Sequence, residues 1–176
     1  MTDHHFESIP GAVEFQVTSE DVKHKGTFST PQLSGIFGVE GGEDKSPHLS
    51  WSGAPEGTKS FVITVYDPDA PTGSGFWHWA VANIPASVTE LPSGAGNSEG
   101  TGLPEGAYQL ANDAGLKSFL GAAPPPGHGV HRYYIVVHAL DVEDIGVPDS
   151  ATPAFLGFNM FGHTLGRAVL LATFGR

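Results

Sequence analysis

Apolar residues recur along the chain in short runs that are typical of β-strands. Residues 60–66 are apolar and mostly β-branched or aromatic, as in a strand that is covered on both faces. Residues 77–84 alternate between two faces, so Trp79 is predicted on one face and His78 on the other. Residues 131–140 form the longest strand candidate. The pattern therefore predicts a sheet built around three long strands.

Three further segments carry a weaker strand pattern, namely residues 12–17, 46–51 and 167–174. The last of these is ambiguous between helix and strand. Gly166 before it and the β-branched Val169 within it favour a strand. The chain thus offers six strand candidates.

Helical signal is confined to the C-terminal part of the chain. Thr152 and Pro153 are a favourable N-cap and first helical residue. The residues that follow could form one apolar face from Phe155, Phe158, Met160 and Phe161. We therefore expect a mainly β protein with few short helices near the C-terminus.

Composition supports short strands joined by ordered turns. The chain has 176 residues with 24 Gly and 14 Pro, and only 15% of its residues are charged. A hydrophobic content of 39% supplies a core and argues against disorder. This length predicts a single domain over residues 1–176.

Charge and cysteine content exclude several classes of function. A net charge of −11 repels phosphodiester backbones and anionic lipid surfaces, so no nucleic-acid partner is expected. No run approaches the roughly 18 apolar residues of a membrane span, so no stable membrane insertion is expected. The chain has no cysteine, which excludes thiolate metal sites and thiol nucleophiles. The amino-terminal residues lack the pattern of a leader peptide, so we expect a cytoplasmic protein. No cofactor and no metal are predicted.

Ionisable residues gather at two places in the sequence. Asp67 and Asp69 follow the strand predicted at 60–66, with Pro71 fixing the next turn and His78 close behind. The second cluster places His131 and Tyr133 on one face at the start of the strand predicted at 131–140.

Carboxylates can orient imidazoles so that the remaining ring N–H groups point into a cleft. Such a cleft binds anions through the imidazoles and nearby backbone N–H groups. The two clusters together therefore predict an anion site, whereas Asp67 to Pro71 taken alone would indicate only a capped turn. The alternative is a small hydrolase or isomerase that uses His78 and His131 as an acid–base pair. No catalytic residue is assigned, because no placed nucleophile accompanies them.

In these two clusters the sequence resembles the phosphatidylethanolamine-binding protein family, which includes the Raf kinase inhibitor proteins. It looks most like the bacterial branch. The resemblance lies in residues 66–71 leading to 77–79 and in residues 121–133, with supporting matches at 46–51, 106–113 and 162–176. These motifs occur in the family's order and span about residues 46–176.

The resemblance implies a β-sandwich with a large central antiparallel sheet and a small pocket for phosphate-bearing or other anionic head groups. It places Asp67, Pro71, His78, His131 and Tyr133 in that pocket, with its wall formed by Gly121, Ala123, Pro124 and Pro125. It also implies a kinase or protease as protein partner and a homodimer.

Overall fold

Two β-sheets share the main hydrophobic core of the protein, whose computed structural model describes residues 12–176. The amino-terminal segment in which no leader is expected lies outside these residues. The strands are β1 (Val13–Glu14), β2 (Gln16–Thr18), β3 (Gly26–Thr27), β4 (Leu49–Ser52), β5 (Ser60–Asp67), β6 (Phe76–Pro85), β7 (Glu90–Leu91), β8 (Tyr108–Gln109), β9 (His131–Leu140) and β10 (Thr164–Phe174). The helices are the short 3-10 helix at Thr30–Gln32 and α1 (Pro153–Met160).

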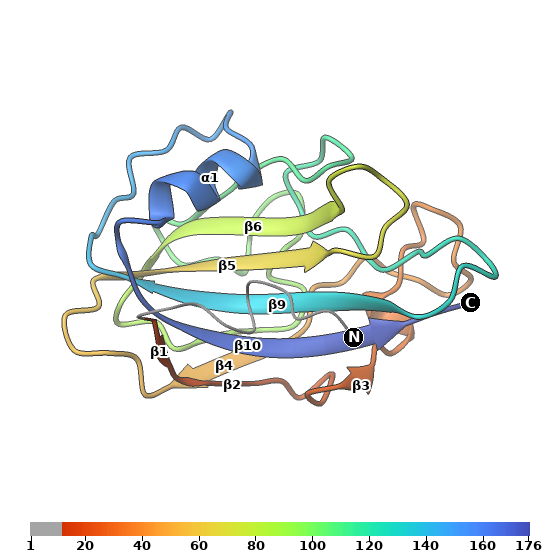
Figure 1. Ribbon diagram of the computed structural model, residues 1–176, viewed down its shortest axis with the longest axis horizontal. Coiled ribbons are helices and arrows are strands. Elements are labelled where there is room, and N and C mark those ends of the chain that lie inside the picture. The colour runs from red at the N-terminus through yellow and green to blue at the C-terminus, as the bar shows by residue number, and fades with distance from the viewer. Residues whose placement is uncertain (1–11) are drawn as a thin grey trace.

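The large sheet has the order β1-β10-β9-β5-β6-β8, and β3 also pairs with β10. Its long strands run antiparallel to their neighbours, whereas β1 and β3 pair with β10 in parallel. The smaller sheet has the order β2-β4-β7. Figure 1 shows β6, β5, β9 and β10 side by side across the molecule. The predicted mainly β fold with a large antiparallel sheet is confirmed.

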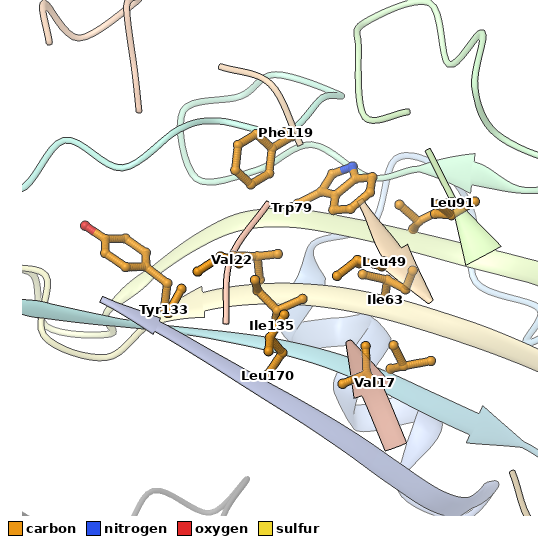
Figure 2. Packing of buried hydrophobic residues seen from close by; sticks show 14 of the residues in the cluster. Val17, Val22, Leu49, Ile63, Trp79, Leu91, Phe119, Tyr133, Ile135 and Leu170 are labelled. Carbon is orange, nitrogen blue, oxygen red and sulfur yellow. The ribbon is translucent and has the colours of Figure 1, made fainter. Parts of the chain in front are cut away.

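The main core lies between the sheets and is drawn in part in Figure 2. Leu49 from the small sheet and Ile63, Trp79 and Ile135 from the large sheet are all fully buried in it. Burying side chains of this size contributes about 1.5–3 kcal/mol each. This core fixes the register of the long strands, since a slip of one residue would turn these side chains outward.

The segment predicted as one strand at 12–17 divides between the two sheets. Its first part, β1, pairs with β10, and its second part, β2, pairs with β4. Phe15 lies between them, is buried in the main core and donates its backbone N–H to the carbonyl of Arg167. The chain therefore crosses from one sheet to the other around this side chain.

The alternation predicted for residues 77–84 is interrupted at its start. Trp77 pairs with Tyr66 and Trp79 pairs with Val65, so His78 is an extra residue in β6. His78 and Trp79 consequently both contact the main core, while Trp77 packs on the opposite face of the sheet. The prediction that His78 and Trp79 lie on opposite faces was wrong because of this bulge.

Helix α1 begins as predicted, with the Thr152 hydroxyl accepting a hydrogen bond from the backbone N–H of Phe155. Leu156 and Met160 pack into a second core on the outer face of the large sheet. The predicted apolar face is divided, because Met160 is buried while the phenylalanines at 155, 158 and 161 are exposed. Within residues 12–176, α1 and every other helix fall short of the length and apolarity that crossing a membrane requires.

Candidate functional site

The ends of three neighbouring strands meet at one end of the large sheet. β5 ends at Asp67, and its two neighbours β6 and β9 begin at Phe76 and His131. Antiparallel pairing brings the carboxyl end of β5 beside the amino ends of both neighbours. The two clusters that are separated by more than fifty residues in the sequence therefore come together here.

A buried hydrogen-bonded pair, His131 and Asp67, lies at this end of the sheet. The Nδ1 atom of His131 is 2.7 Å from Oδ2 of Asp67, and the two side chains are only 2% and 4% exposed. The second carboxylate oxygen of Asp67 accepts the backbone N–H of Asp69 at 2.8 Å. Because the carboxylate accepts, His131 carries a proton on Nδ1 and its Nε2 is the nitrogen left for other contacts.

His78 faces the same region from β6. Its Nδ1 lies 2.8 Å from the backbone carbonyl oxygen of Leu120, which can only accept a hydrogen bond, so Nδ1 is protonated. Burial lowers the pKa of His78, against opposing contributions from the Leu120 carbonyl and from Asp67. Near neutral pH the ring of the free protein is therefore neutral, with a lone pair on Nε2.

Tyr133 completes the group, two residues after His131 on β9. Its ring lies 5.3 Å from the His78 ring, centroid to centroid, and the residue is 1% exposed. Its hydroxyl has no hydrogen-bond partner within residues 12–176, although it is buried. Burial raises the pKa of this phenol, so the hydroxyl stays protonated. A buried hydroxyl without a partner costs about 1–3 kcal/mol and is available to a ligand.

The opposite wall is formed by residues 120–125, which a distant loop holds in place. Both oxygens of the Asp44 carboxylate accept backbone N–H groups, from Gly121 at 2.8 Å and from Ile36 at 3.0 Å. The backbone N–H of Ser34 donates to the carbonyl of Ala122. These bonds join the loop at 33–44 to the wall before any ligand binds.

These elements enclose a cavity of about 220 Å³. Nine of the ten predicted site residues line it, namely Asp67, Pro71, His78, Gly121, Ala123, Pro124, Pro125, His131 and Tyr133. Five further residues that were not predicted also line it, namely Phe37, Ala70, Thr72, Phe76 and Leu120. Most of these adjoin predicted residues in the sequence, so their neighbours could have indicated them, but no local signal marks Phe37.

Asp69 is the predicted site residue that does not line the cavity. Its carboxylate instead accepts three hydrogen bonds from Arg132, through the backbone N–H, Nε and Nη2 at 2.8–2.9 Å. Burial alone would raise the pKa of Asp69, but the bonds from Arg132 outweigh it and lower the pKa. Asp69 thus joins the loop after β5 to the start of β9.

The chemistry of the cavity is that of a hydrogen-bond donor site with apolar walls. Its lining within residues 12–176 holds no Lys or Arg, so positive charge would have to come from the two imidazoles. No three His, Asp or Glu side chains of this part of the chain are grouped as metal ligands. The hydroxyl of Thr72 donates to the carbonyl of Gly75 rather than to either histidine. The arrangement suits binding of an oxygen-bearing anion better than nucleophilic catalysis.

Comparisons with known proteins give one consistent family. The sequence profile described as "Phosphatidylethanolamine-binding protein" matches residues 18–175. YbcL of Escherichia coli is 50% identical over 157 residues, which cover 89% of this chain and 85% of that protein. YbhB of the same organism is 50% identical over 133 residues, covering 76% of this chain and 83% of YbhB.

Solved structures give the same result. The crystal structure of E. coli YbcL, described as a new member of the mammalian PEBP family, superposes with a TM-score of 0.89 at 48% identity. The superposition covers 93% of this chain and 99% of YbcL. A putative phosphatidylethanolamine-binding protein homologue from Chlamydia trachomatis superposes with a TM-score of 0.76 at 29% identity, covering 94% of this chain and 99% of that one.

Proposed function

Because the chain belongs to the phosphatidylethanolamine-binding protein family, in the bacterial branch with YbcL, we propose that it binds small molecules carrying an anionic oxygen group. The group would enter the cavity between His78, His131 and Tyr133, and a phosphate head group has the required chemistry. The observation that carries this proposal is the buried Tyr133 hydroxyl, which has no partner in the described chain. The Tyr133 ring packs against the His78 imidazole, and both residues line the same cavity as His131.

The roles of the residues follow from their bonds. The Tyr133 hydroxyl donates to one ligand oxygen, and a protonated His78 donates through Nε2 to another. Asp67 keeps the His131 ring oriented and stabilises a positive charge on it. Charge-assisted hydrogen bonds contribute about 1.5–3 kcal/mol each, but ordering and desolvation subtract from their sum. Simple anions are therefore expected to bind with dissociation constants in roughly the micromolar to millimolar range.

Three finer points stay predictions. They are a kinase or protease partner, a homodimer, and the alternative that His78 and His131 act as an acid–base pair of a hydrolase or isomerase. The acid–base alternative uses the same cavity as anion binding, so the two are separated by measuring binding first.

Replacing Tyr133 with phenylalanine is expected to weaken binding of inorganic sulfate by about tenfold or more, because one donor to the anion is lost. The free energy of unfolding should stay the same or rise by up to about 1 kcal/mol, because an unpartnered buried hydroxyl is removed. Calorimetric titration and urea unfolding measure the two effects.

Tyr134→Phe is the matched control. Tyr134 is equally buried but lies on the opposite face of the sheet, and its hydroxyl accepts a hydrogen bond from Arg132. This variant should bind sulfate normally and gain no stability. If both variants behave alike, the Tyr133 hydroxyl is not a ligand contact.

Affinity for sulfate should fall as the pH rises. Burial lowers the pKa of His78 in the free protein, whereas a bound anion favours the imidazolium and raises it. Binding therefore takes up a proton between the lower free-state pKa and the higher bound-state pKa. Affinity is greatest at pH values below the free-state pKa and is lost as the pH rises through the bound-state pKa. Titrations on both sides of the ordinary histidine pKa, about 6.5, test this, and a flat profile would contradict a protonated His78.

A further inference from the structure

The imidazole of His128, in the turn between the cavity wall at 120–125 and β9, contacts the imidazole of His131. Nδ1 of His128 is 2.7 Å from Nε2 of His131, and the two ring centroids are 4.9 Å apart. His128 itself is exposed to solvent and does not line the cavity. It therefore contacts the buried His131 ring from the solvent side.

This contact uses the ring nitrogen that a ligand would need. Nδ1 of His131 is committed to the buried carboxylate of Asp67 at 2.7 Å, and that carboxylate is itself held by the backbone of Asp69. Only Nε2 of His131 can change its partner without breaking a buried ion pair. In the free protein that position belongs to His128.

We propose that His128 competes with the bound anion for Nε2 of His131 and acts as a gate that the ligand displaces. This inference rests on the proposed function. In the closed form, one of the two facing nitrogens carries the shared proton and the other accepts it. In the open form, Nε2 of His131 carries a proton, which it keeps from the closed form or takes from His128 or from solvent, and it donates to an oxygen of the anion. His128 then turns into solvent with water as its partner. The free energy needed to displace His128 is therefore subtracted from the anion's binding free energy, and it lowers the observed affinity.

The backbone around His128 suits such a movement. Glycines flank it at 127 and 129 with φ values of 76° and 98°, and neither glycine has a neighbour in the space beside its α-carbon. The base of the turn is held, because the backbone N–H of Gly127 donates to Arg176 and Nε of Arg176 donates to the carbonyl of Pro124. The backbone N–H of His128 is also bonded, to the carbonyl of Pro125, so the opening movement is a rotation of the His128 side chain into the open space beside the two glycines.

The test is to replace His128 with alanine and to titrate the full chain with inorganic sulfate by calorimetry. Removing an internal competitor and leaving water on Nε2 should tighten sulfate binding by roughly two- to tenfold, the range of a single hydrogen bond. Val130→Ala is the control, since Val130 is exposed on the same turn and its apolar side chain cannot form a hydrogen bond with the His131 ring. Weaker or unchanged binding in His128→Ala would overturn the gate.

A second measurement needs no substitution. In the wild-type protein, nuclear Overhauser contacts between the two imidazole rings should be present without sulfate and lost at saturation. Contacts that persist at saturation would overturn the gate even if sulfate binds well, and the proposed function would then stand. If sulfate binds to neither the wild type nor His128→Ala, the proposed function itself fails, and the gate with it.

Discussion

Replacing His131 with alanine is expected to abolish measurable sulfate binding and to lower the free energy of unfolding by about 3–5 kcal/mol. The variant leaves the Asp67 carboxylate, which is 3% exposed, without its ionic partner. An uncompensated buried carboxylate is costly, and it also repels an incoming anion. Urea unfolding and calorimetric titration give the two values.

The chain offers a closely matched control for this result. His163 and Asp141 form a second pair of the same kind, with a nitrogen–oxygen distance of 2.8 Å against 2.7 Å. The difference is burial, because the side chains of this second pair are 44% and 43% exposed. His163→Ala should therefore cost less than about 1 kcal/mol and leave binding unchanged.

A double variant separates folding from binding. Replacing Asp67 with asparagine together with His131→Ala removes the buried charge, so much of the lost stability should return, while binding stays absent. Sulfate binding by the double variant at wild-type affinity would show that neither Asp67 nor His131 contributes to anion binding.

Replacing Gly121 with alanine is the second change with a large expected effect. A Cβ atom there would lie 2.3 Å from the carbonyl carbon of Leu33 and 2.6 Å from the backbone nitrogen of Ser34. Backbone atoms of two segments cannot both yield, so the wall must move away from the loop and lose the bond from Gly121 to Asp44. We expect a loss of about 3 kcal/mol in the free energy of unfolding, with loss of sulfate binding.

Gly73→Ala is the matched control for the wall. Gly73 lies in the loop between β5 and β6, next to the cavity residue Thr72, and a Cβ atom there would meet nothing within 4 Å. This variant should unfold and bind sulfate as the wild type does. Equal stability of Gly121→Ala and Gly73→Ala would show that the close approach of wall and loop is not required.

Much of the fold could be predicted from the sequence because the long strands carry local signals. The apolar run at Ser60–Asp67 and the strand at His131–Leu140 are central strands of the large sheet, and such strands read as continuous apolar segments. The helix start at Thr152 is equally local, since an N-cap depends on residues only three positions apart.

The errors came from features that depend on pairing partners. The bulge at His78 is invisible in β6 itself, because it is defined by the register against Tyr66 and Val65 of β5. Asp69 was predicted in the site because it follows the same strand as Asp67, and its bonds to Arg132, which comes from a distant strand, could not be foreseen from that position.

The support of the wall could not be predicted for a related reason. Asp44 lies in a polar loop with no strand or motif beside it, yet it bonds to Gly121, seventy-seven positions away. Phe37 reaches the cavity only because of the same loop. Long-range contacts of irregular segments leave no periodic trace in a sequence.

The most direct test of the account is a crystal structure of the protein with selenate, whose anomalous scattering identifies the anion without ambiguity. We expect one strong peak inside the cavity, within hydrogen-bond distance of the Tyr133 hydroxyl and of Nε2 of both His78 and His131, with His128 turned away. An empty cavity at a selenate concentration that saturates the protein in solution, or a peak elsewhere on the surface, would contradict it.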